Sequence, residues 1–147
     1  MILQHPSLLI TDDDSSFRET LRFVLERRGY RTLLAANGEE ALEILKHSDV
    51  HLALLDMHMP KLTGLETLRR VRQMHSRLPC ILLSARLDDA LIQQARIAEA
   101  FSVLSKPISR DTLTSTVELA IRRTYEDPSD HLLPPDQGPQ LPPQRRF

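Results

Sequence analysis

The chain has 147 residues, of which 41% are hydrophobic and 27% charged, with a formal net charge of −1 at pH 7. That length suits one domain with a sizeable core, and the near-neutral charge argues against a dedicated nucleic-acid binder. The lone cysteine, Cys80, excludes an intramolecular disulfide and a thiol-based zinc site. We expect a cytoplasmic protein, because the N-terminus lacks a signal-peptide pattern and no apolar run is long enough to span a membrane.

The first predicted strand, residues 7–11, is apolar and leads into a triplet of aspartates. A helix follows, because apolar residues recur at helical spacing: Phe17, Leu21, Val24 and Leu25. Two starts fit this helix, a capping box of Ser16 with Glu19 or a cap by Asp14. Gly29 stands where a left-handed C-terminal cap is expected.

Further strands and helices alternate along the chain. Strands are predicted at residues 30–35, 51–56, 79–84 and 100–105, and several of them read as unbroken apolar runs, typical of strands buried on both faces. The predicted helices are 39–47, a stretch beginning near Leu65, 88–98, and one that Ser109 caps. Five strands alternating with five helices predict a doubly wound parallel α/β sheet with helices on both faces, because the crossovers are right-handed.

The composition changes at residue 127. Residues 127–147 contain six of the ten prolines and few large apolar side chains. Such a segment cannot bury enough surface to offset its ordering entropy, so we expect a disordered or polyproline-like tail after a folded domain of residues 1–126. A passive tail is favoured over a docking peptide on this composition.

Polar side chains follow four of the predicted strands at their carboxyl ends. The first strand leads into Asp12 and Asp13, the third ends in Asp56, the fourth in Ser84, and the fifth precedes Lys106. These ends meet at one edge of a parallel sheet, where open α/β sheets bind their ligands. Three adjacent carboxylates repel one another unless a cation neutralises them, and oxygen ligands favour Mg²⁺.

These residue types fit the roles that phosphoryl transfer requires. The carboxylate of Asp56 can attack phosphorus as a nucleophile. Mg²⁺ held by Asp12 or Asp13 together with Asp56 would offset the charge of the transferring group. Lys106 supplies a second positive charge and Ser84 a hydrogen bond to a phosphoryl oxygen. Little more is needed, because phosphoryl transfer depends mainly on positioning and electrostatic stabilisation.

The chain resembles the CheY-like receiver domains of bacterial two-component response regulators, whose fold is flavodoxin-like. The resemblance covers nearly everything from about Ser7 to Arg123. It is carried by six segments in order: Leu9-Ile10-Thr11-Asp12-Asp13-Asp14, Ala36-Asn37-Gly38-Glu39-Glu40-Ala41-Leu42, Leu54-Leu55-Asp56-Met57-His58-Met59-Pro60, Gly64-Leu65, Leu83-Ser84-Ala85 and Ser105-Lys106-Pro107.

The resemblance implies roles for these residues in a phosphorelay. Asp56 would accept a phosphoryl group from a sensor histidine kinase or a phosphotransfer protein. Mg²⁺ would be bound by Asp12, Asp13 and Asp56, together with the backbone carbonyl of His58. Ser84 and Lys106 would sense the phosphoryl group, and a cis peptide bond would join Lys106 to Pro107.

The sequence departs from the family pattern at the switch positions, Ser84 and Val103. Val103 stands three residues before Lys106, where family members usually carry an aromatic ring that moves on activation. Phe101 is predicted to face the same side of its strand as Val103, by alternation. Glu99 replaces the usual glycine, which predicts a differently closed fourth helix. Ser84 keeps the hydroxyl of the commoner threonine.

We therefore expect a receiver that changes its protein–protein contacts when Asp56 is phosphorylated. Its downstream partner would bind the face formed by the fourth helix, fifth strand and fifth helix. No output domain, direct nucleic-acid contact or membrane contact is expected within this chain, and no catalysis beyond its own phosphorylation and dephosphorylation. Two alternatives remain at this stage: a phosphorylation-independent receiver-like interaction module, and a magnesium-dependent phosphatase, which usually needs a second acid where His58 stands.

Overall fold

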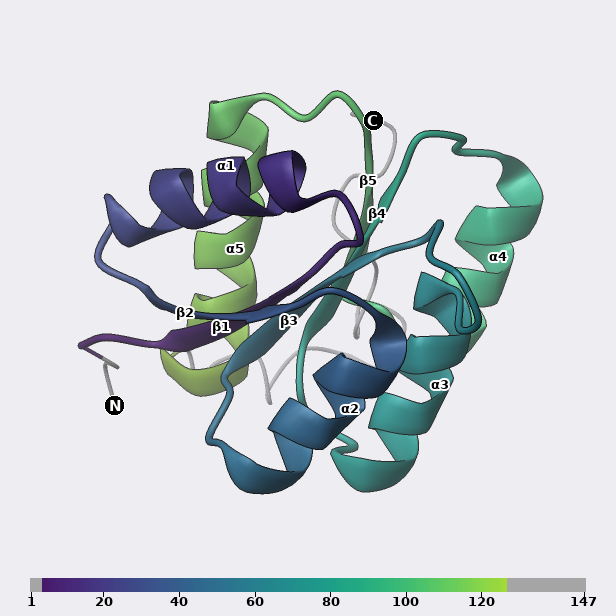
Figure 1. The fold of residues 1–147 in the computed structure, drawn as a ribbon, viewed down its shortest axis with the longest axis horizontal. Helices are drawn as coiled ribbons and strands as arrows, with labels where there is room; N and C mark the ends of the chain where they lie inside the picture. Colours follow the sequence, from purple (N-terminus) through teal and green to yellow (C-terminus); the bar gives the residue numbers. More distant parts are fainter. Residues whose placement is uncertain (1–3, 127–147) are drawn as a thin grey trace.

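The computed structural model describes residues 4–126, which form a parallel sheet between two layers of helices (Figure 1). The strands are β1 (Ser7–Thr11), β2 (Arg31–Ala35), β3 (Leu52–Asp56), β4 (Cys80–Ser84) and β5 (Ser102–Ser105). Their order across the sheet is β2-β1-β3-β4-β5, with every neighbouring pair parallel. The doubly wound sheet is thus confirmed, whereas the tail predicted at residues 127–147 lies outside the described residues.

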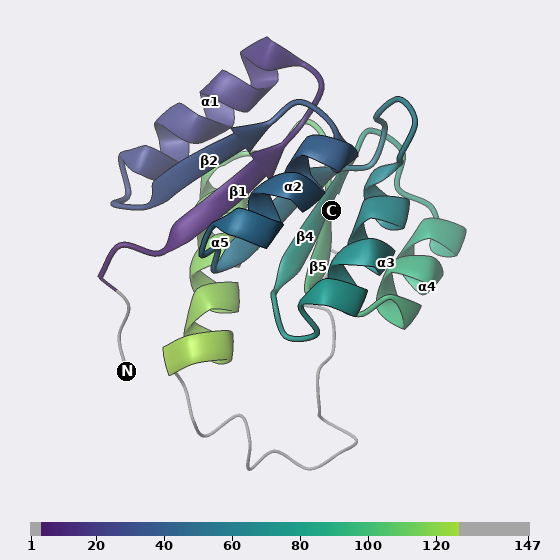
Figure 2. The same cartoon turned by 60° about the horizontal axis from the view of Figure 1, so that its bottom comes forward.

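Helices cover both faces of the sheet, as right-handed crossovers require. One face carries α1 (Ser15–Glu26) and α5 (Arg110–Ile121), and the other carries α2 (Gly38–His47), α3 (Gly64–Met74) and α4 (Asp89–Ile97) (Figure 2). A π-helical segment, η1 (Arg122–Glu126), continues α5. Among the helices of residues 4–126, none has the length and apolar character that crossing a membrane requires.

The core follows from the alternation of side chains along the strands. In β3, Leu52 and Leu54 pack in the cluster beneath α1 and α5, whereas Ala53 and Leu55 pack in the cluster beneath α2, α3 and α4. All four side chains are fully buried. Burying one leucine contributes about 1.5–3 kcal/mol, so the two clusters fix the register of β3 and with it the place where the strand ends.

The helix ends confirm some capping predictions and correct others. The carboxylate of Asp14 accepts the N–H groups of Ser16 at 3.0 Å and Phe17 at 3.2 Å, so Asp14 caps α1 and the capping box of Ser16 with Glu19 is wrong. Gly29 adopts the expected left-handed conformation, with φ of 96°. The serine N-cap predicted for α5 is confirmed.

A capping box that was not predicted begins α3. The Thr63 hydroxyl accepts the N–H of Glu66 at 3.1 Å, and the Glu66 carboxylate accepts the N–H of Thr63 at 2.9 Å. The pattern of a threonine followed three residues later by a glutamate was readable in the sequence. This box fixes the start of α3 directly after the loop that leaves the third strand.

The end of α4 keeps a left-handed residue although no glycine is present. Glu99 has φ of 64°, and the N–H groups of Glu99 and Ala100 donate to the carbonyls of Arg96 and Ala95, which is the pattern of a Schellman motif. The prediction of a different closure is therefore wrong. The Arg72 guanidinium donates to the Glu99 carbonyl at 2.7 Å and helps to hold the turn.

We expect Glu99→Gly to stabilise the protein. A left-handed conformation costs a residue with a side chain about 1–2 kcal/mol, and glycine avoids that cost while losing more entropy on folding. The predicted net gain in unfolding free energy is about 0.5–1 kcal/mol, measured by urea denaturation. Glu99→Ala, which keeps the β-carbon, should gain nothing; an equal gain in both variants would assign the effect to loss of the carboxylate instead.

Candidate functional site

The carboxyl ends of β1, β3, β4 and β5 bring the predicted residues to one edge of the sheet. Asp12 directly follows β1, Asp56 and Ser84 are the last residues of β3 and β4, and Lys106 directly follows β5. β1 lies between β2 and β3, so the strand order reverses there and opens a crevice at the strand ends. The site is thus built by strands whose register the core fixes.

Three carboxylates gather at this edge. Oxygen atoms of Asp12, Asp13 and Asp56 all lie within 4.8 Å of one another. Asp12 is 0% and Asp56 3% exposed, while Asp13 faces solvent. This donor set contains only oxygen and carries high negative charge, which fits a hard divalent cation such as Mg²⁺.

Lys106 lies between the two buried carboxylates. Its Nζ is 3.1 Å from Asp12 Oδ2 and 2.9 Å from Asp56 Oδ1, and 22% of its side chain is exposed. The peptide bond between Lys106 and Pro107 is cis, as predicted. Although burial opposes its charge, the two carboxylates raise the pKa of Lys106 above 10.5. The ammonium therefore partly neutralises the acidic cluster.

The pKa of Asp56 is raised above its ordinary value of 3.8. Burial is the largest cause and the negative charge of Asp12 adds to it, while Lys106 and a backbone hydrogen bond from His58 pull the pKa down. Burial outweighs the lysine because the carboxylate has lost nearly all of its water. The contacts from Lys106 and His58 thus offset only part of the effect of burial on Asp56.

Asp56→Asn is expected to stabilise the protein at neutral pH in the absence of divalent cations. Because the folded pKa lies above the unfolded value, ionised Asp56 destabilises the fold above the folded pKa, and this cost disappears as the pH falls below about 3.8. The urea midpoint of Asp56→Asn should therefore exceed that of the wild type by less and less as the pH is lowered from neutral. A gain that is absent at neutral pH, or that grows in acid, would contradict the account.

The Ser84 hydroxyl is engaged by the loop after β4. It donates to the Arg86 carbonyl at 2.6 Å, accepts the Arg86 N–H at 3.0 Å, and lies 3.4 Å from His58 Nε2. Ser84 is fully buried, whereas His58 and Arg86 are exposed. The structure thus brings Ser84 to the site edge, with its hydroxyl directed to its own loop.

The first turn of α1 also belongs to the site, and this was not predicted. The N–H of Asp14 donates to Asp12 Oδ1 at 2.8 Å, and Arg18 Nη1 donates to the Asp12 carbonyl at 2.5 Å. The ring of Phe17 faces the ammonium of Lys106, with 4.3 Å from Nζ to the ring centroid. In the sequence, Phe17 stands out only as one of the apolar residues at helical spacing.

Val103 and Phe101 lie on opposite faces of the sheet. Val103 is fully buried in the cluster beneath α2, α3 and α4, while Phe101 packs against the cluster beneath α1 and α5. The prediction that both face one side is therefore wrong. The alternation does not reach Phe101, because β5 begins only at Ser102.

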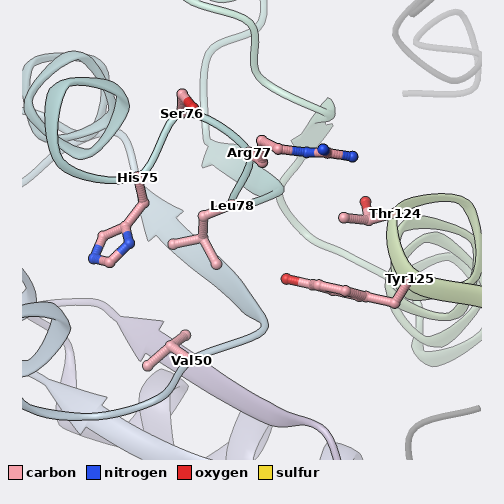
Figure 3. Close-up of a pocket in the computed structure, with 7 residues that line it drawn as sticks. All are labelled: Val50, His75, Ser76, Arg77, Leu78, Thr124 and Tyr125. Atoms are coloured by element: carbon pink, nitrogen blue, oxygen red, sulfur yellow. The ribbon is translucent and has the colours of Figure 1, made fainter. Parts of the chain in front are cut away.

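A pocket of about 400 Å³ lies at the opposite end of the strands from the acidic cluster, near the starts of β3 and β4 (Figure 3). Arg77 extends across it toward Thr124. The pocket is lined by Val50, His75, Ser76, Arg77, Leu78, Thr124 and Tyr125. None of them is among the residues at the carboxyl ends of the strands. The acidic edge, with its convergent charges, is therefore the candidate site.

Comparisons with known proteins point to one family. The family model described as the response regulator receiver domain matches residues 8–118. Transcriptional regulatory protein AfsQ1 of Streptomyces coelicolor is 34% identical over 125 residues, which cover 85% of this chain and 55% of that protein. Response regulator MprA of Mycobacterium leprae is 37% identical over 121 residues, or 82% and 53% of the two chains. The chain thus spans about half the length of these relatives.

Solved structures show the same fold. Chemotaxis protein CheY4 of Vibrio cholerae superposes with a TM-score of 0.76 at 27% identity, covering 79% of this chain and 98% of that one. Response regulator TrrA of Thermotoga maritima, solved in complex with Mg²⁺-BeF, gives 0.72 at 30% identity, covering 78% and 98%. With the family model matching most of its length, the chain belongs to the response regulator receiver domain family of two-component signalling systems.

Proposed function

We propose that residues 1–126 form the phosphoacceptor module of a two-component phosphorelay, in which Asp56 accepts a phosphoryl group from a sensor histidine kinase or a phosphotransfer protein. The observation that carries this proposal is the contact of Lys106 Nζ with both Asp56 Oδ1 and Asp12 Oδ2, beside a cluster of three carboxylates. A nucleophile, a metal-binding donor set and a fixed cation are the components that phosphoryl transfer needs.

In the proposed reaction, a carboxylate oxygen of Asp56 attacks the phosphorus atom of the donor. The bond from phosphorus to the donor nitrogen breaks, and its electron pair leaves with the donor imidazole, which takes up a proton. The ammonium of Lys106 offsets charge on the phosphoryl oxygens. The hydroxyl of Ser84 donates to one of them after it leaves the Arg86 carbonyl, which it contacts in this structure.

Mg²⁺ is the proposed cofactor. Asp12, Asp13 and Asp56 would bind it together with the backbone carbonyl of His58. When bound, it would supply positive charge that lets these acids and the phosphoryl oxygens lie close together. The oxygen-only donor set supports this choice.

The proposed output is a change in protein–protein contacts at the face formed by α4, β5 and α5, in the cytoplasm. Ser84 ends β4 and pairs with Ser105 of β5, so movement of its hydroxyl toward a phosphoryl group would act directly beside Ser105, two residues after Val103. Val103 is fully buried and carries no ring, so the change that a partner reads would come from the loop after β4 and from α4.

Phosphoryl transfer from a histidine kinase in the presence of Mg²⁺ tests this function. The wild-type chain should take up label from the phosphorylated kinase, and chelation of divalent cations should stop the uptake. Asp12→Asn should require a higher Mg²⁺ concentration for the same rate, because it removes one buried ligand. If neither chelation nor Asp12→Asn changed the rate of phosphoryl uptake, the proposed metal site would be rejected.

A further inference from the structure

We propose that Phe17 is a positioning residue for Lys106, a role that deepens the proposed function and rests on it. The ring centroid of Phe17 lies 4.3 Å from Lys106 Nζ, within the distance at which an ammonium is attracted to the face of an aromatic ring. The contact joins the first turn of α1 to the residue after β5, which lie far apart in the sequence.

Lys106 is held by three groups. Asp12 and Asp56 contact its ammonium at 3.1 and 2.9 Å, and the Phe17 ring adds a third contact that carries no formal charge. A lysine side chain has high rotamer entropy and a strongly hydrated ammonium. The ring restricts the conformations of the Lys106 side chain. Because the ring is uncharged, it adds no further ion that would compete with a phosphoryl group for the ammonium.

Local structure fixes the ring in this place. The N-cap carboxylate of Asp14 accepts the Phe17 N–H at 3.2 Å, which sets the first turn of α1. The next residue, Arg18, donates to the Asp12 carbonyl and ties the same turn to the acidic loop. Phe17 is half-buried and also packs against the core cluster beneath α1 and α5, so a packing role must be separated from the proposed one.

Two substitutions make this separation. Phe17→Leu keeps an apolar side chain against the core but removes the aromatic face, and Phe17→Tyr keeps the face. Phe23→Leu is the matched control, because Phe23 lies on the same helix, is 62% exposed, and contacts Arg27 rather than the site. Urea midpoints of all variants show whether each is folded under the conditions of the assay.

Lysine spectra measure the contact directly. The chain has only three lysines, Lys46, Lys61 and Lys106, so ¹³C-labelled lysine gives few side-chain signals, and Lys106→Arg assigns the one of interest. We expect the Lys106 ε-methylene to be shifted upfield by the Phe17 ring in the wild type and in Phe17→Tyr. In Phe17→Leu it should move to the position of the two exposed lysines; an unchanged signal there would overturn the proposal.

Phosphoryl uptake from an acyl phosphate measures the consequence. Phe17→Leu should slow uptake about threefold to tenfold without weakening Mg²⁺ binding, and Phe17→Tyr should restore the rate. If Phe17→Tyr slowed phosphoryl uptake as much as Phe17→Leu, or if Phe23→Leu did so, the effect would come from packing alone and the positioning role would be rejected. If the wild type takes up no phosphoryl group, the proposed function fails, and the lysine spectra alone decide whether the ring holds Lys106.

Discussion

Lys106→Met is expected to slow phosphoryl uptake by Asp56 about 10²–10³-fold, the usual loss when one group that stabilises transition-state charge is removed. Methionine has similar length, so the apolar part of the side chain is retained while the ammonium is lost. In the wild type that ammonium lies 2.9 Å from Oδ1 of Asp56, the carboxylate that is proposed to attack phosphorus. Initial rates with an acyl phosphate, at saturating Mg²⁺, measure the effect.

The same substitution should also lower stability, because Asp12 and Asp56 are left buried without their counter-charge. The expected loss in unfolding free energy is about 3 kcal/mol in the absence of divalent cations, a typical cost of breaking a buried pair. Lys61→Met is the control, since that side chain is 79% exposed and its ion pair with Glu39 is long at 3.9 Å and therefore weak. If Lys106→Met matched this control in both rate and urea midpoint, Lys106 would have no role in the site.

Gly64→Ala should disturb the end of β3, where Asp56 lies, although the substituted residue starts α3. A β-carbon at Gly64 would lie 2.4 Å from the Asp56 carbonyl oxygen and 2.8 Å from Met57 Cα, both backbone atoms that no rotamer change can move. The Gly64 N–H also donates to the Met57 carbonyl at 2.9 Å. We expect a loss of about 1–3 kcal/mol in unfolding free energy and a shifted Asp56–Met57 peptide.

Amide spectra distinguish this local effect from general destabilisation. Gly29→Ala serves as the control, because Gly29 has φ of 96° and a β-carbon there would meet no atom within 4 Å, so alanine strains only the backbone of that turn. Both variants should lose stability, but only Gly64→Ala should shift the Asp56 and Met57 amide signals and slow phosphoryl uptake. Unchanged Asp56 and Met57 signals in folded Gly64→Ala would show that the close approach is not a constraint on the site.

Most of the site could be predicted because its residues lie at strand ends. An apolar run locates each strand, and in a parallel sheet the residue that follows the run must lie at the common edge. Asp12, Asp56, Ser84 and Lys106 were found in this way, and the structure places all four there. The rule needs only the period of the strands and their direction, not the packing of any particular side chain.

The misses concern contacts that periodicity does not determine. The face of Phe101 could not be predicted because β5 begins at Ser102, two residues after the predicted start. The contact of the Phe17 ring depends on the relative position of α1 and β5. Glu99 was expected to change the end of α4, yet hydrogen bonds of Ala100 and Arg72 keep it left-handed. In each case tertiary contacts outweigh a local preference.

The most direct test of the account is to locate the phosphoryl group. The wild-type chain and Asp56→Asn are incubated with Mg²⁺ and an acyl phosphate, and intact mass is followed by proteolysis and peptide mass mapping. We expect one phosphoryl adduct per wild-type chain, on the peptide that contains Asp56, and none in Asp56→Asn. No adduct in the wild type, or an adduct that persists in Asp56→Asn, would contradict it.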